Sequence, residues 1–156
     1  MPRTAKHYQN SKTTKSSLGD VVDRIHKRCF QIGLLKWYEI SGRDLPWRRT
    51  ADPYKILVSE VMLQQTQVDR VIPKYHEFLG KYPTVKALAK AKPEEVRKTW
   101  YPLGYNMRPY RLHKIACEVV EQYGGKIPND SRKLQSMKGI GRYTACLLYT
   151  SPSPRD

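Results

Sequence analysis

Residues 57 to 68, LVSEVMLQQTQV, constrain the fold most, because one carboxylate, Glu60, stands there in a run that otherwise resembles a protein core. Residues three and four positions apart share one face of a helix, so Glu60 shares its face with Ile56, Leu57 and Leu63. The other faces are also apolar, since they carry Val58, Val61 and Met62. A helix that is apolar nearly all round is typical of a buried position, so the segment predicts a buried helix that contains one carboxylate.

The carboxylate of Glu60 has two interpretations. A buried carboxyl group without a partner is costly, and its usual adaptation is a raised pKa that keeps it protonated. A protonated carboxyl group beside a cavity can act as a general acid. A core glutamate that is satisfied by an arginine or by backbone groups would also have a shifted pKa, so this segment alone leaves both interpretations open.

Apolar residues recur at helical spacing along most of the chain. Helices are expected at residues 20–42, 85–91, 93–100, 112–123 and 131–137. Two more are expected between the first two of these: one that opens at Pro53 and contains Glu60, and one that is marked by Val71 and Leu79 and ended by Pro83. Asp52, Thr84 and Asp130 stand where N-caps are needed, and Gly124-Gly125 stands where a helix must stop. Neither a strand pattern nor an internal repeat of about 30 to 50 residues is found. The sequence therefore predicts an all-α domain of short helices.

The chain is strongly basic. Its 156 residues include 29 Lys and Arg against 14 Asp and Glu, a net charge of +15, which points to a polyanionic partner. No apolar run approaches the ~20 residues that span a bilayer, and no secretory signal is found, so nucleic acid is favoured over a membrane. A ribosomal-type basic protein would share this charge, but it would not require eleven Tyr and three Trp.

Cysteine and histidine patterns indicate no metal site in this chain. Cys29, Cys117 and Cys146 are far apart and lack C-x-x-C spacing, so neither a disulfide framework nor a set of metal ligands is expected. Reduced thiols are typical of a cytoplasmic protein. The four histidines are scattered, and we interpret them as surface residues.

Residues 134 to 145, LQSMKGIGRYTA, carry a glycine-rich turn between two helices. Gly139 and Gly141 bracket Ile140, and a new helix is expected to start near Arg142. Such a turn lets the backbone approach a phosphate, towards which the N–H groups of the helix start then point. Lys138 and Arg142 add positive charge. The pattern fits a helix-hairpin-helix DNA-binding element, and an ordinary turn between helices is the alternative.

Four segments together resemble a known family. RDLPWR, DPYKILVSEVMLQQTQV, PLGYNMR and MKGIGRYTA occur in the order and spacing of MutY-type adenine DNA glycosylases, over about residues 30 to 145. The resemblance implies the all-α helix-hairpin-helix DNA glycosylase fold, mainly its six-helix domain, with the cluster-bearing half incomplete. It implies a hydrolase that removes adenine mispaired with 8-oxoguanine or guanine in base excision repair. The implied partner is double-stranded DNA with such mismatches, bound by a cytoplasmic, nucleoid-associated monomer.

The resemblance also implies roles for individual residues. Glu60 would protonate the extruded adenine and then help to activate water, and Tyr143 matches a supporting position near the catalytic centre. Gln65 would enter the duplex, Thr66 would contact the oxidised guanine, and Tyr105 would wedge beside the lesion. The matching walls of the adenine pocket are Arg43, Leu45, Trp47, Arg48 and Val68. The hairpin residues expected on DNA are Lys138, Gly139, Gly141 and Arg142.

Some of these roles have plain alternatives. Tyr105 could be a core tyrosine at the start of a helix, and Trp47 could equally be a core anchor. Gln64 is expected to support the local backbone rather than to probe DNA. The segment PLGYNMRPYR departs from the commoner GLGYYSRAR of the family, which leaves the loop around the lesion less defined.

The resemblance ends after Ala145. The family continues with an Asp-Gly-Asn segment, whose aspartate stabilises an oxocarbenium-like intermediate, and with four cysteines that hold a 4Fe-4S cluster. Neither follows here, and Asp156 stands in the wrong context. Residues 146 to 156, CLLYTSPSPRD, match a translated sequencing adapter, with a natural Pro-rich tail as the alternative. We therefore expect a disordered basic tail at 1–17, a partial glycosylase domain at 18–145, a non-native tail at 146–156, and no turnover by this chain.

Two other functions stay open. A thymine glycosylase acting on G·T mismatches would share the Ser-Glu motif, but it typically has basic residues where Gln64 and Gln65 stand, so the QQTQ run favours adenine. A noncatalytic helix-hairpin-helix DNA-binding protein is the second alternative, and the apolar setting of Glu60 argues against it.

Overall fold

The computed structural model describes residues 18 to 150, and the chain divides into two units between Arg43 and Asp44. The tail predicted at 1–17 lies outside the described residues, and so do residues 151–156 of the tail predicted at 146–156. The first part of that predicted tail, residues 146–150, belongs to a helix that spans Arg142–Thr150, and Leu148 in it is buried. Helices and loops make up the described part, which contains no strand, as the sequence predicted.

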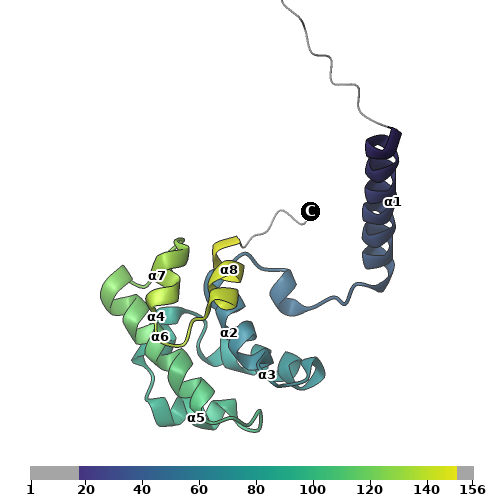
Figure 1. Ribbon diagram of the computed structural model, residues 1–156. Helices are drawn as coiled ribbons and strands as arrows, with labels where there is room; N and C mark the ends of the chain where they lie inside the picture. Colours follow the sequence, from purple (N-terminus) through teal and green to yellow (C-terminus); the bar gives the residue numbers. More distant parts are fainter. Residues whose placement is uncertain (1–17, 151–156) are drawn as a thin grey trace, which may run out of the picture. The chain divides into compact units, whose positions relative to one another are not determined.

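The first unit contains one helix, α1, which spans Leu18–Ser41 (Figure 1). Considered by itself, this helix exposes large apolar side chains along its length. They include Val22, Ile25, Phe30, Ile32, Leu34, Leu35, Trp37, Tyr38 and Ile40. A helix that displays so much apolar surface is typical of one that normally packs against another element.

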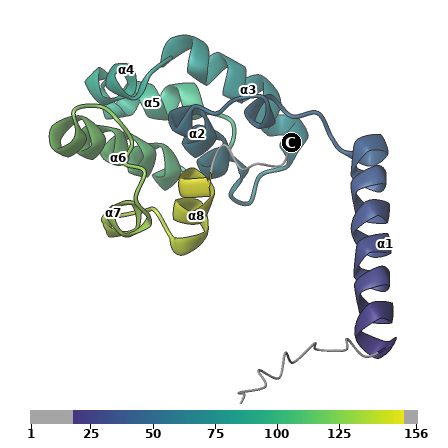
Figure 2. The same cartoon turned by 90° about the horizontal axis from the view of Figure 1, so that it is seen from above.

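The second unit contains a short 3-10 helix and seven α-helices (Figures 1 and 2). Their bounds are η1 Pro46–Arg48, α2 Pro53–Leu63, α3 Val68–Lys81, α4 Val85–Lys90, α5 Pro93–Trp100, α6 Met107–Tyr123, α7 Ser131–Ser136 and α8 Arg142–Thr150. Helix α2 packs against η1, α3, α6 and α8, and α6 also packs against α4 and α5. Helix α2 is thus central in this unit, and most of its side chains are buried, as its composition predicted.

The core of the second unit is made of aliphatic and aromatic side chains from all of these helices. Phe78, which is fully buried, packs edge-on against Trp100 and Tyr82, with ring centroids 5.8 and 5.0 Å apart. Side chains of this kind dominate core energetics because each one removes a large apolar area from water. The core fixes the position of the C-terminal end of α2, beside which the candidate site lies.

Helix ends lie where their sequence signals placed them. Asp52 accepts a hydrogen bond from the Tyr54 amide at 2.9 Å, and Thr84 and Asp130 cap α4 and α7 in the same way. Helix α6 ends at Gly124, where the backbone turns left-handed with φ +63°. These local signals are confirmed because a cap depends on its own turn and little else.

No helix within residues 18 to 150 combines the length and the apolar character that crossing a membrane requires.

Candidate active site and DNA-probing loops

Glu60 lies in the last turn of α2, half-buried between the fully buried side chains of Ser59 and Val61. Its carboxyl group has no hydrogen-bond or ion-pair partner among the described residues, so no arginine or backbone group satisfies it. Burial raises the pKa of Glu60 above its ordinary value. Partial access to solvent together with a raised pKa is the environment that a general acid needs.

The residues predicted to wall an adenine pocket lie in different environments. Leu45 and Trp47 are buried in the core, where Trp47 packs edge-on against Tyr75 at 5.4 Å between ring centroids. This is the core-anchor position that the sequence left open for Trp47. Arg48 is exposed at the end of η1, and Val68 is half-buried at the start of α3. Arg43 belongs to the first unit.

The loop from Gln64 to Gln67 joins α2 to α3 and carries the residues predicted to enter the duplex. Gln65 is exposed, and its backbone lies in the left-handed region with φ +57°. Thr66 is half-buried, and its hydroxyl oxygen accepts a hydrogen bond from Arg108 Nη2 at 3.0 Å. The loop therefore presents one side chain outward and holds the next one inward.

The loop from Tyr101 to Asn106 joins α5 to α6 and carries the predicted wedge residue. Tyr105 is 58% exposed, so it is not the core tyrosine of the alternative interpretation. Its backbone is also left-handed, with φ +48°.

Gln65 and Tyr105 are the only non-glycine residues with positive φ in the part of the chain that the structure describes. A non-glycine residue in this region costs on the order of 1–3 kcal/mol and persists only where its surroundings hold it. The resemblance predicts a DNA contact for each of these two residues. Such outliers cluster at binding and catalytic sites, which makes the two loops a candidate site on geometry alone.

A cavity of about 620 Å³ lies between the two loops. Its lining consists of Gln64, Gln65, Tyr105, Asn106, Met107, Arg108 and Arg111. The cavity brings together Gln65 and Tyr105, one residue from each loop, which are 40 residues apart in the sequence.

Arg108 is a residue of this site to which the sequence assigned no role. It is only 5% exposed, although arginine is mostly a surface residue. It lies on the same face of α6 as Leu112, Ile115 and Val119, all of which are buried. This spacing is the signal that could have identified it, since it places an arginine on the core face of an amphipathic helix.

Helices α7 and α8 form the predicted hairpin around Gly139 and Ile140. Gly139 has φ +112°, a conformation that side chains rarely adopt, and Ile140 is buried beneath the turn. Lys138 and Arg142 are exposed at either side, and the Ala145 amide donates to the Gly141 carbonyl at 2.9 Å. Exposed cations flank a tight turn at a helix start, which suits a phosphate.

Tyr143 lies in the first turn of α8 and is 72% exposed. Helix α8 packs against α2, the helix that carries Glu60. The structure records no contact of Tyr143 with Glu60, so the supporting role of Tyr143 stays a prediction.

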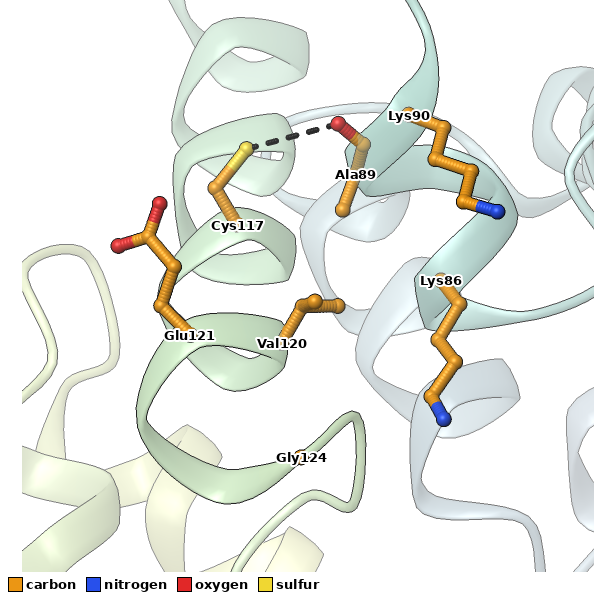
Figure 3. A pocket seen from close by; sticks show the side chains of 7 residues that line it. All are labelled: Lys86, Ala89, Lys90, Cys117, Val120, Glu121 and Gly124. Carbon is orange, nitrogen blue, oxygen red and sulfur yellow. Dashed lines mark hydrogen bonds between the residues drawn. The ribbon is translucent and has the colours of Figure 1, made fainter.

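A second hollow, of about 430 Å³, lies between α4 and α6 (Figure 3). Its walls are Lys86, Ala89, Lys90, Cys117, Val120, Glu121 and Gly124, none of which the sequence placed in a site. The Cys117 thiol faces the Ala89 carbonyl oxygen at 3.8 Å, and burial raises its pKa. A thiol in this environment is held in its unreactive form.

The described residues do not fit an iron-sulfur cluster. No three or more of their histidine, cysteine and acidic side chains come together as a metal site. The three cysteines lie on α1, α6 and α8, and a 4Fe-4S cluster needs four thiolates as a rule.

Comparisons with known proteins identify the family. The model of the "HhH-GPD superfamily base excision DNA repair protein" family matches residues 58–147. The adenine DNA glycosylase of Mycolicibacterium smegmatis is 43% identical over 128 residues, which cover 79% of this chain and 44% of that protein. The human adenine DNA glycosylase is 47% identical over 125 residues, covering 74% of this chain and 23% of that protein.

Thymine glycosylases are similar too. The thymine-DNA glycosylase of Aeropyrum pernix is 44% identical over 125 residues, which cover 78% of this chain and 56% of that protein. The solved structure of a thermostable thymine-DNA glycosylase superposes with a TM-score of 0.76 at 29% identity, covering 83% of this chain and 60% of that one. An endonuclease III structure with DNA, at 20% identity and a TM-score of 0.64, shares the fold.

The chain spans less than two thirds of each of these relatives. The all-helical fold, the hairpin and the matched family model nevertheless agree over the same residues. This chain belongs to the HhH-GPD superfamily of base excision DNA repair proteins.

Proposed function

We propose that this chain is part of an adenine DNA glycosylase that removes adenine paired with 8-oxoguanine or guanine. The observation that carries the proposal is the continuity of α2 with the first probing loop. Glu60, unpartnered and with a raised pKa, lies only four residues before Gln64, where the loop begins. The residue suited to acid catalysis and a loop suited to entering DNA therefore belong to one short segment.

The chemistry needs a proton donor because adenine is a poor leaving group. A glycosylase first extrudes its target nucleotide into a pocket. Protonation of the adenine ring by Glu60 lets the base leave with the electrons of the N-glycosidic bond. The resulting carboxylate then helps to activate the water that attacks the sugar, and it recovers a proton in doing so.

The two loops would recognise the mismatched base pair. Extruding a base leaves a gap, which Gln65 has the size and the hydrogen-bonding groups to fill. Tyr105 is exposed and aromatic, so it can stack beside the lesion. Thr66 would contact the oxidised guanine, and the Gly139–Gly141 hairpin would bind a phosphate. The proposed partner is double-stranded DNA with such mismatches, bound by a monomer at the nucleoid.

A thymine glycosylase acting on G·T mismatches is the second candidate. It is favoured by the similarity to thymine glycosylases, which is as high as that to adenine glycosylases. Against it stand Gln64 and Gln65, since basic residues are typical of thymine glycosylases at these positions. Base specificity must therefore be measured directly.

The test joins residues 1 to 145 to the remaining C-terminal part of the M. smegmatis adenine glycosylase. The chimera is assayed for base release from duplexes that contain A·8-oxoguanine, A·G or G·T. Adenine release from the first two supports the proposal, whereas thymine release from the third supports the second candidate. Binding without release of any base would support a noncatalytic DNA-binding protein.

Glu60→Gln in the chimera tests the acid. The amide keeps the shape of the side chain but cannot donate the proton, so adenine release should fall by about 10²–10⁴ while mismatch binding is retained. Near-normal release by this variant would show that Glu60 is not the acid. The 156-residue chain alone is expected to bind DNA without turnover and without iron-sulfur absorbance. In the family, the stabilising aspartate and the cluster cysteines come after the segment that matches this chain up to Ala145, and residues 146 to 156 do not contain them.

A further inference from the structure

The guanidinium group of Arg108 contacts both DNA-probing loops at once. Its Nη1 nitrogen donates to the carbonyl oxygens of Val61 at 3.1 Å and Met62 at 2.9 Å, at the end of α2. The same nitrogen donates to the carbonyl oxygen of Gln64 in the first loop. These are carbonyls that the end of a helix leaves without partners, so a cation there also complements the helix dipole.

The other nitrogen reaches both loops. Nη2 donates to the Thr66 hydroxyl at 3.0 Å, and to the carbonyl oxygens of Leu103 at 3.1 Å and Gly104 at 3.3 Å. The two terminal nitrogens carry four N–H groups, which serve six oxygens, so some of these bonds are shared. The guanidinium carbon also lies 5.0 Å from the centroid of the Tyr105 ring.

These contacts explain the two strained residues. Gln65 lies between Gln64 and Thr66, both of which are bonded to Arg108, and Tyr105 directly follows Gly104, which is bonded to it as well. A left-handed non-glycine residue persists only where its neighbours hold it. The hydrogen bonds of Arg108 supply this restraint in both loops that border the cavity.

We propose that Arg108 is a positioning residue that joins the Gln64–Gln67 loop and the Tyr101–Asn106 loop into one preorganised DNA-probing unit. The inference rests on the proposed function for its DNA step, but the joining of the loops is a property of the protein without DNA. Lysine cannot replace arginine here, because an ammonium group donates from a single point and lacks the planar fork.

The first measurement is amide hydrogen exchange in the 156-residue chain without DNA. The Thr66 and Leu103 amides are hydrogen-bonded, at 3.3 and 3.1 Å, so each reports the opening of its own loop. In Arg108→Lys both amides should exchange about tenfold faster, whereas the exchange rates of the amides within the helices should stay unchanged. An unchanged Thr66 or Leu103 amide would overturn the proposal.

Arg70→Lys is the matched control. The Arg70 side chain donates to the Pro102 carbonyl at 3.0 Å, so this bond reaches the Tyr101–Asn106 loop. Arg70 contacts the Gln64–Gln67 loop only through its backbone amide, which the replacement keeps. The same replacement at this position should leave the exchange of the Thr66 amide at its wild-type rate. Acceleration of Thr66 in both variants would show a general loosening and would overturn the specific role of Arg108.

The second measurement is the fluorescence of 2-aminopurine placed beside an A·8-oxoguanine pair. Wild-type chain should unstack the probe and raise its fluorescence. Arg108→Lys should lose that rise yet bind a matched duplex within about twofold of wild type, since phosphate contacts dominate affinity. A full rise in Arg108→Lys would overturn the proposal. If wild type gives no rise while the exchange results hold, the proposed DNA reading fails and the joining of the loops stands.

A measurement on wild type alone covers the case in which Arg108→Lys does not fold. Exchange of the Thr66 and Leu103 amides is followed across low urea concentrations. If one guanidinium holds both loops, the two amides share a single opening reaction and show the same urea dependence. Two different opening reactions would overturn the proposal without any variant.

Discussion

Burial shifts the pKa of two ionisable side chains near the C-terminal end of α2, Glu60 on that helix and Arg108 on α6. It raises the pKa of Glu60 and lowers that of Arg108, so in each case it disfavours the charged form. Arg108 nevertheless keeps its charge at neutral pH, because arginine does not lose its proton in proteins. Glu60 has no such protection, and its protonation state is therefore the one that pH can change.

Glu60 should make the fold less stable as pH rises. The pKa of Glu60 in the folded state lies above the ordinary value of 4.5. Its contribution to the free energy of unfolding is therefore fully present below pH 4.5 and is lost as pH rises through the folded-state pKa. Glu60→Gln should therefore be more stable than wild type at pH 7.5 and equal to it at pH 4. Urea denaturation at both pH values checks this, and an unchanged difference between them would contradict it.

Cys117 should react slowly with thiol reagents. It is half-buried beside the Ala89 carbonyl and burial raises its pKa, whereas Cys29 is exposed on α1. At pH 7.5 we expect its labelling by iodoacetamide to be at least about tenfold slower than that of Cys29, since the thiolate is the nucleophile. Mass spectrometry of labelled peptides gives both rates, and equal rates would show that the hollow between α4 and α6 opens readily.

At the scale of single elements, features that depend on one turn of the chain can be predicted from the sequence, whereas contacts between distant segments cannot. The caps of α2, α4 and α7 were predicted because each depends on one side chain and the amides of the next turn. The role of Arg108 was not predicted, because its six acceptors come from two segments, residues 61–66 and 103–104, that lie far apart in the sequence. The partial exposure of Glu60 was missed for the same reason, since only packing decides which face of an apolar helix stays open.

The two glycines of the hairpin should separate stability from binding. Gly139 has φ +112°, so Gly139→Ala should destabilise the fold by about 1–3 kcal/mol. Gly141 has no such φ and open space around it, so Gly141→Ala should leave stability nearly unchanged. Its new methyl group should instead lower DNA affinity by keeping the backbone from the phosphate.

Thermal denaturation and fluorescence anisotropy with a short duplex measure the two effects on the same samples. A Gly141→Ala variant that binds DNA as wild type does would show that the hairpin is an ordinary turn between helices, the alternative that the sequence left open.

At the scale of the whole chain, charge is the dominant property. The excess of fifteen positive charges is spread over a chain whose family binds and repairs DNA. Exposed cations at the hairpin, Lys138 and Arg142, account for only part of it. We therefore expect general attraction to the phosphate backbone to support the proposed DNA binding alongside the two loops.

Binding of the 156-residue chain to duplex DNA should depend strongly on salt. If several phosphates are neutralised, the affinity should fall by at least about 100-fold between 50 and 200 mM salt, through release of counterions. Anisotropy titrations at four salt concentrations give the slope. A slope near zero, or no binding at 50 mM, would contradict the assignment of DNA as the partner.

The left-handed backbone at Gln65 and Tyr105 also limits which sequences can occupy these positions. Asparagine, aspartate and glycine accept positive φ, whereas valine, isoleucine and threonine rarely do. A library randomised at both positions and selected only for folding should therefore be depleted of β-branched residues. The same library selected for mismatch recognition should lose glycine as well, so the difference between the two pools would separate what the backbone tolerates from what the DNA demands.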